Sequence, residues 1–257
     1  WTPVPWFTWG VSYMSASSMS LKGDYKMEYS DEWVQPFSAL SQHSPLSGVW
    51  NFLGLPRGLR EETGPAKMDL DMPSQFNTGI SLKLTPAWKL NLDAHWTDWA
   101  KWDGLNIEFD HETDFLRIAS ILQPEYATDR VLTIPRHYKS VWSYSVGVEY
   151  QYSEPLALRC GVEDRRSSVP KDKLDVLLPL GHAYLFGAGL EYKLDRYSQV
   201  DLSGGYLTSK AKVPAGSSTN ANSMDTATSF IYNPYSGINF ETQAQGLIAE
   251  VNYTSMF

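Results

Sequence analysis

Two long runs of alternating apolar and polar residues, which meet at Thr85-Pro86, constrain the fold of this chain most strongly. Successive side chains of a β-strand point to opposite faces, so alternation of this kind predicts a hairpin with one apolar and one polar face. The apolar face carries Phe76, Thr78, Ile80, Leu82 and Leu84 on the first strand and Trp88, Leu90, Leu92, Ala94 and Trp96 on the second.

The ends of the second strand indicate what the apolar face meets. A soluble sandwich also alternates, with its apolar side in the core. Here, however, Trp88 and Trp96 stand at the two ends of the apolar run, as in the aromatic girdles of membrane barrels. We therefore expect the apolar faces to contact lipid and the polar faces to line a lumen.

Composition narrows the class of protein further. The mean hydropathy is −0.33 and no apolar run approaches 18 residues, which argues against helical membrane spans. A membrane barrel is still allowed, because its strands divide their apolar content between alternate positions. A net charge of −8 argues against a nucleic-acid partner. The single cysteine rules out a thiolate zinc site, and there is no phosphate-cradling glycine loop, so we expect no cofactor and no metal.

The remaining sequence continues the same pattern. Tight turns at 85–86, 153–155 and 195–197 alternate with longer loops at 26–67, 111–138, 167–181 and 214–238. Short turns on one side and long loops on the other are typical of outer-membrane barrels. The last alternating strand, 239–257, ends on Phe257, which resembles the assembly signal of bacterial outer-membrane proteins. We predict an all-β fold, a transmembrane antiparallel β-barrel with about eight strands here, formed by one domain over residues 1–257.

Several stretches resemble one family. They are LKGDY at 21–25, LDMP at 70–73, WTDWAKWDGLNIEF at 96–109 and the run from 138 to 170. Together they resemble the FadL-type transporters of long-chain fatty acids and other hydrophobic compounds, over essentially the whole chain. The resemblance implies the bacterial outer membrane and a fourteen-stranded barrel with an N-terminal hatch in its lumen. This chain resembles the last eight strands, so we expect a C-terminal portion without the hatch; a closed eight-stranded form is the alternative.

The first long loop holds an apolar segment formed by Leu46, Val49, Trp50, Phe52, Leu53 and Leu55. Exposed apolar patches mark binding sites, and the resemblance implies that this loop is part of an external groove for hydrophobic ligands. The alternative is that the segment packs as the loop's own core, since loops of this length need one.

Two cations are candidates for binding a ligand carboxylate. The resemblance implies that Lys139, at the start of a strand, faces the ligand head group, and Arg136 lies close to it in sequence. The alternative is that both are ordinary solvated charges at the barrel rim. Other charges fall on lumen faces, where we expect most of them to neutralise one another because unpaired charge in a narrow lumen is unfavourable. They are Lys83, Lys89, Asp93, Glu149, Arg159, Glu163, Glu191 and Glu250.

These features predict an outer-membrane transporter whose partners are membrane lipid and a hydrophobic small molecule, either a fatty acid or an aromatic hydrocarbon. A porin for small polar solutes is the first alternative, although a porin has no use for the apolar loop. A barrel hydrolase is the second. The five histidines are scattered and none sits in a nucleophile motif, so we expect no enzyme activity.

Overall fold

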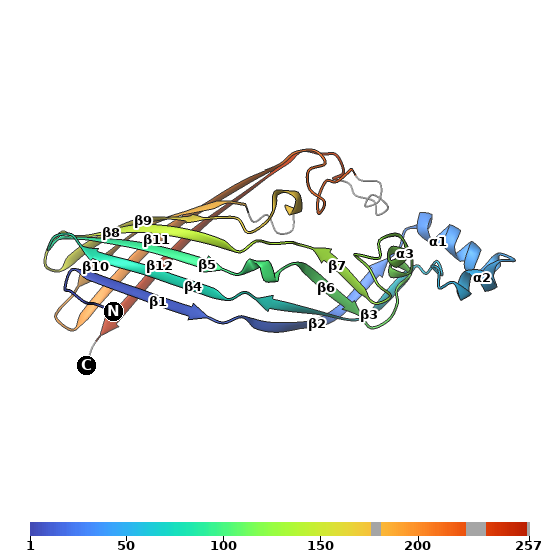
Figure 1. The fold of residues 1–257 in the computed structure, drawn as a ribbon, viewed down its shortest axis with the longest axis horizontal. Coiled ribbons are helices and arrows are strands. Elements are labelled where there is room, and N and C mark those ends of the chain that lie inside the picture. The colour runs from blue at the N-terminus through green and yellow to red at the C-terminus, as the bar shows by residue number, and fades with distance from the viewer. Residues whose placement is uncertain (176–180, 225–234, 256–257) are drawn as a thin grey trace.

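The computed structural model describes residues 1–175, 181–224 and 235–255. The molecule is elongated (Figure 1): a large sheet occupies one end, a smaller sheet follows it, and helices α1 (Asp31–Ser38) and α2 (Ser47–Phe52) form the far tip. Both chain termini lie at the end opposite the tip. No helix in these ranges is long and apolar enough to cross a membrane.

The large sheet, called the wall here, has eight antiparallel strands. In spatial order they are β1 (Phe7–Met14), β4 (Gln75–Lys83), β5 (Trp88–Thr97), β8 (Val141–Gln151), β9 (Leu156–Arg165), β10 (Ala183–Lys193), β11 (Ser198–Val213) and β12 (Phe240–Ser255). The predicted tight turns all join neighbouring wall strands at the end where the termini lie, which confirms the predicted fold class.

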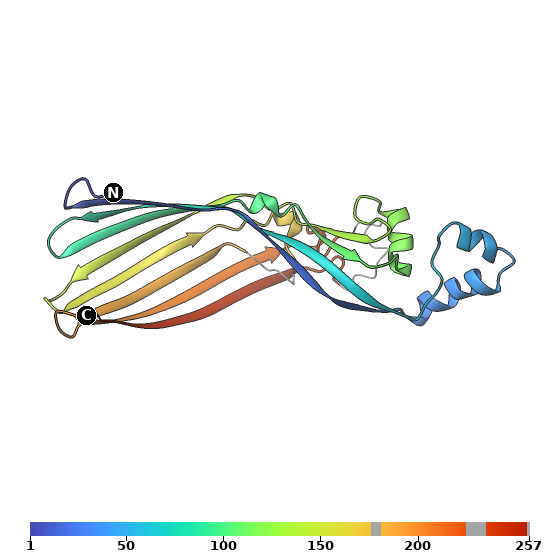
Figure 2. The same ribbon diagram turned by 90° about the horizontal axis from the view of Figure 1, so that it is seen from below.

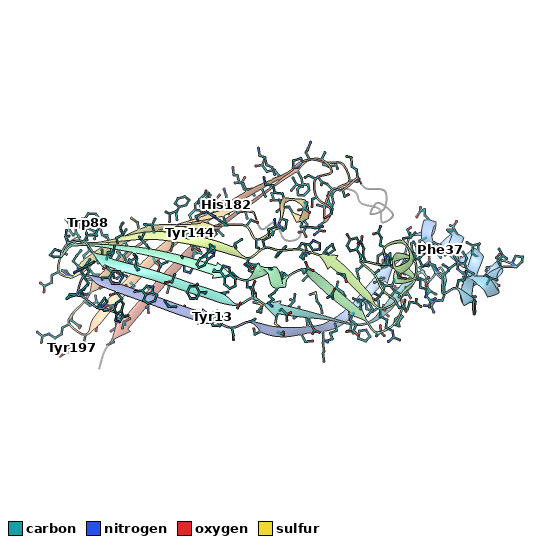
Figure 3. All side chains as sticks on the ribbon, in the orientation of Figure 1. Tyr13, Phe37, Trp88, Tyr144, His182 and Tyr197 are labelled. Atoms are coloured by element: carbon teal, nitrogen blue, oxygen red, sulfur yellow. The ribbon has the colours of Figure 1, made fainter. Side chains whose placement is uncertain are left out.

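The register confirms the predicted faces of the Thr85-Pro86 hairpin. Ile80 pairs with Leu92, and Leu92 pairs in turn with Val146 of β8, so these apolar side chains form one row on the outer face. Trp88 and Trp96 are eight residues apart, about 27 Å along a strand, which matches an apolar band about 25 Å tall. Figure 3 places Trp88 and Tyr197 at one end of the wall, and Tyr144 and His182 toward the other.

A second sheet continues the wall beyond a break in its first four strands. Its order, β2 (Ser17–Glu28), β3 (Glu61–Met72), β6 (Gly104–Phe109) and β7 (Val131–Pro135), repeats that of β1, β4, β5 and β8. The predicted long loops at 26–67 and 111–138 contain helices and strands that were not predicted from the sequence. The first contains α1, the π-helical turn Ala39–His43, α2 and the start of β3, and the second contains α3 (Asp114–Leu122) and β7.

Buried apolar side chains form two small clusters, both beyond the central part of the wall. One packs Phe109, Leu116, Ala119 and Ala127 around α3; the other packs Tyr138, Val169, Leu174 and Val213 where the wall ends. The outer face is exposed instead, with Val251 at 74% and Leu247 at 86%. Such a surface needs lipid around it. Among the described residues, neither buried cluster lies in the central part of the wall.

The wall is an open sheet in the described residues, because β1 and β12 each pair on one side only. The alternative of a closed eight-stranded barrel is therefore wrong for this structure; Phe257 lies outside the described residues.

Unpaired backbone groups facing lipid cost several kcal/mol each. We expect the isolated 257-residue chain to associate through β1 and β12 or to refold poorly, as measured by light scattering in detergent. A monodisperse, heat-modifiable monomer would contradict this.

Candidate functional site

The far tip presents the exposed part of the predicted apolar segment. Leu46 is 63% exposed, Val49 58%, Phe52 89% and Leu53 59%, and all four lie in or beside α2. Figure 2 shows this tip carried beyond both sheets on the hairpin of β2 and β3. The tip is therefore an apolar surface held away from the wall, as a capture surface requires.

The other two residues of the segment face inward. The Trp50 Nε1 donates to the Pro56 carbonyl oxygen at 2.7 Å, and Leu55 is half-buried. The Trp50 ring closes an aromatic series in which Tyr29 stacks on Trp33 at 5.5 Å and Trp33 meets Phe37 edge-on at 4.7 Å. The structure thus divides the segment: Trp50 and Leu55 form the tip's own core, and the remaining four residues are its exposed surface.

A pair of buried carboxylates anchors the tip to α3. Asp114 accepts the backbone N–H groups of Arg57 and Leu59, each at 3.0 Å, and is fully buried. Glu62 accepts the Tyr29 hydroxyl at 2.6 Å and the Asp114 N–H at 2.8 Å. The Arg57 guanidinium lies 3.4 Å from both carboxylates, so a single cation bridges them. This anchor, formed by Tyr29, Arg57, Glu62 and Asp114, fixes both ends of the tip.

Tyr29 of the anchor and the nearby Tyr25 stay protonated because the pKa of each hydroxyl is raised. Burial raises the pKa of the Tyr29 hydroxyl far above its ordinary value, and its hydrogen bond to Glu62 raises it further. Burial also raises the pKa of Tyr25 to about 12, with the negative charge of Asp110 adding to the effect. Both hydroxyls are therefore donors at any physiological pH, which is what the neighbouring carboxylates need.

The predicted head-group cations lie at the junction of β7 and β8. His137 takes a left-handed backbone there, with φ of 48°. Arg136 and Tyr138 on either side of it are buried, whereas Lys139 is exposed. Arg136 is 3% exposed, and its guanidinium forms an ion pair with Asp175. Within the described part of the chain, the Lys139 ammonium has neither an ion pair nor a hydrogen bond. Arg136 is therefore buried and paired, whereas Lys139 is exposed and available to a ligand.

The tip and the junction are not brought together. Figure 1 shows α2 at the far end of the molecule, with the small sheet between it and the start of β8. Beside the junction, between β3, β6 and β7, is a cavity of about 520 Å³. Its lining combines apolar side chains, among them Leu70, Trp102 and Leu105, with the carboxylates of Asp69, Asp71, Asp103 and Glu125. A ligand taken up at the tip would reach Lys139 only after passing along this small sheet.

On the inner face of the wall, five of the eight predicted lumen charges form ion pairs, whereas Lys83, Asp93 and Glu250 form none with the described residues. Arg159 forms ion pairs with Glu149 at 2.8 Å, with Asp201 at 3.0 Å and with Glu191. Lys89 approaches Glu149 at 3.8 Å, and Glu163 pairs with Arg165 at 2.9 Å. Next to this network are inward-facing glycines that occupy one row over four strands: Gly147, Gly161, Gly187 and Gly205.

The sequence analysis did not identify the carboxylates whose ion pairs decide which cations are available to a ligand. Asp175 lies 39 residues from Arg136, and Asp114 lies 57 from Arg57. The available signal for Asp114 was local: Thr113 precedes an apolar helical stretch and its hydroxyl caps α3 through the Leu116 N–H at 3.3 Å. No local pattern identifies the partner of Arg136.

An antiparallel wall with an apolar outer face, aromatic ends and charges paired on its inner face defines a membrane protein of the outer-membrane barrel class. The sequence profile described as "Outer membrane protein transport protein (OMPP1/FadL/TodX)" matches residues 1–257. The chain belongs to this family, whose members are located in the bacterial outer membrane.

Similar proteins agree with this assignment. The long-chain fatty acid transport protein of Escherichia coli O6:H1 is 22% identical over 84% of this chain and 42% of its own length. An outer membrane protein of Neisseria meningitidis serogroup B is 26% identical over 75% of this chain and 37% of its own length. The chain thus spans less than half the length of these curated relatives.

Solved structures share the fold. A Pseudomonas aeruginosa FadL homologue superposes with a TM-score of 0.64 at 17% identity, covering 99% of this chain and 50% of that one. The Ralstonia pickettii toluene transporter TbuX gives 0.53 at 12% identity, covering 99% of this chain and 45% of that one.

Proposed function

We propose that this chain forms the wall and the external capture surface of a transporter that moves hydrophobic compounds across the outer membrane. The observation that carries the proposal is the exposed apolar surface of Leu46, Val49, Phe52 and Leu53, which the anchor holds beyond the wall. Desolvating an apolar ligand against such a surface contributes about 25 cal/mol per Å² of area buried. The named activities of the relatives, long-chain fatty acid transport and toluene transport, support this class of ligand.

Within this class we favour long-chain fatty acids, with Lys139 as the partner of the carboxylate. Lys139 is exposed two residues before β8, and the cavity at the end of β7 is lined by the nearby His137. Arg136 is committed to Asp175, so we assign it to holding the junction in the shape that presents Lys139. A charge-assisted hydrogen bond in a partly dry site contributes about 1.5–3 kcal/mol.

Replacing Lys139 by alanine tests the head-group assignment. We expect Lys139→Ala to weaken oleate binding about 10- to 100-fold, since each 1.4 kcal/mol is a factor of ten. The affinity for oleyl alcohol should hardly change, because the alcohol carries no charge. Fluorescence titration or calorimetry with both ligands measures the preference, and Lys22→Ala on β2 is the matched control. An unchanged acid-to-alcohol preference in Lys139→Ala would mean that the ligand is an uncharged hydrophobic compound.

The same titrations test the capture surface separately. Val49→Ser with Phe52→Ser should weaken both ligands equally, because only apolar contact is lost. Both side chains are more than half exposed, so the change should leave the tip folded. If this double variant bound both ligands as well as the wild type does, the tip would not be the capture surface.

A further inference from the structure

The outer face of the wall carries a cluster of cations at the end that faces the small sheet. The cluster, called the cationic rim here, consists of Arg166, His182, Lys210 and Lys212. It lies where β9 ends, β10 begins and β11 continues beyond them.

The register places three members of the rim in one row. Ala183 pairs with Arg165 on one side and with Ser209 on the other, so the next residues toward this end are Arg166, His182 and Lys210. A Cβ added to Gly181 would lie 3.1 Å from the Lys210 carbonyl oxygen, which shows that the strands remain adjacent there. With strands about 4.8 Å apart, the outer two members are about 10 Å from each other. Lys212 is two residues further along the same face.

The rim sits directly on the aromatic end of the wall. The Arg166 guanidinium carbon is 5.4 Å from the centre of the Tyr144 ring, and the His182 ring stacks on Tyr184 at 4.9 Å. Figure 3 shows Tyr144 and His182 in this region. Aromatic belts mark the level of lipid head groups, so cations beside them are at the height of the phosphates.

Nearby carboxylates pair with members of the cationic rim but do not neutralise all of its positive charge. Asp164 forms a hydrogen bond with His182 and lies 3.6 Å from the Arg166 Nε, while Lys212 lies 3.7 Å from Glu241. Three formal cations therefore face two carboxylates with His182 neutral, on a chain whose net charge is −8. The Arg166 side chain is 57% exposed and that of Lys212 81%, and Lys210 has no ion pair within the described ranges. All three side chains are therefore accessible from outside the protein.

We propose that the cationic rim binds the phosphate groups of lipid head groups in the outer leaflet. An arginine can hold a phosphate through two parallel hydrogen bonds, and lysines add point charges beside it. The ligand is a resident membrane lipid and not the transported compound, so the inference goes beyond the proposed function. It also gives the wall a fixed height and rotational position in the membrane.

Removing the charges of Arg166 and Lys210, which flank His182 in the row, tests the proposal. The purified protein in detergent is titrated with diphosphoryl lipid A and the bound fraction is measured by native mass spectrometry. Each cation near an anionic surface contributes about fivefold to binding, so Arg166→Gln with Lys210→Gln should weaken it about 20- to 30-fold. Lys22→Gln with Arg196→Gln removes the same charge from the small sheet and from the turn at the opposite end of the wall. This control should bind as the wild type does.

Two outcomes would overturn the proposal. If the rim variant and the control lost affinity equally, the lipid would be responding to net charge and not to the rim. If inorganic phosphate at the concentration of the lipid displaced it, the rim would be a free-anion site. Heat-modifiable migration of every variant confirms that each one is folded before its affinity is compared.

Discussion

Replacing Asp114 by alanine is expected to release the tip from the rest of the molecule. The side chain is fully buried and accepts the backbone N–H groups of Arg57 and Leu59. Each buried donor left without a partner costs about 1–3 kcal/mol, so loss of both hydrogen bonds should destabilise the anchor by about 2–6 kcal/mol. Hydrogen exchange followed by mass spectrometry should then show amides 57–62 exchanging about 30- to 20,000-fold faster.

Asp31→Ala is the matched control for this change. Asp31 also pairs with an arginine of the tip, Arg60 at 2.6 Å, but both side chains are more than half exposed. Exposed ion pairs contribute about 0–1 kcal/mol, so exchange should rise less than about tenfold. Equal exchange rates in the two variants would show that Asp114 is not the anchor. Ligand binding at the tip should fall in Asp114→Ala and be retained in Asp31→Ala.

An arginine at Leu92 is expected to destabilise the wall strongly. Leu92 lies on the outer face of β5, midway between Trp88 and Trp96, and pairs with Ile80 and Val146. A charge at the bilayer midplane costs about 2–4 kcal/mol. Denaturant unfolding of the protein in lipid vesicles, followed by tryptophan fluorescence, measures the loss.

Asn91→Arg places the same charge one residue away on the inner face. Asn91 lines the cavities of that face and lies beside Asp93, which can compensate a new cation. We expect a much smaller loss of stability than for Leu92→Arg. Equal losses at the two positions would mean that the faces of the wall have been assigned the wrong way round.

The wall could be predicted from sequence because alternation is a local signal. Each residue's face follows from its position in the run, and the segment between the predicted turn at 195–197 and the predicted loop at 214–238 is β11, Ser198–Val213. The hairpin at Thr85-Pro86 was predictable for the same reason, since its two runs need only a short turn to pair.

The small sheet and the tip were not predictable in the same way. The breaks between the two sheets are short, only Ser15-Ala16 and Pro73-Ser74 in the first two strands, and β6 and β7 are six and five residues long. The tip's helices are also short, and Pro36 inside α1 argues locally against a helix. The availability of Lys139 and Arg136 depended on Asp175, whose proximity is decided only by tertiary structure.

The full-length pairing of β2 with β3 makes the tip a candidate cassette for protein engineering. All twelve residues of each strand pair, from Ser17 with Met72 to Glu28 with Glu61, so the stalk is a regular ribbon with a defined seam. A tip from another family member could be grafted onto this ribbon with its register preserved. The graft would have to bring its own equivalents of Tyr29 and Arg57, because Tyr29 donates to Glu62 of the retained ribbon and Arg57 meets Asp114 on α3. The apolar capture surface would then be exchangeable without redesigning the membrane-embedded strands.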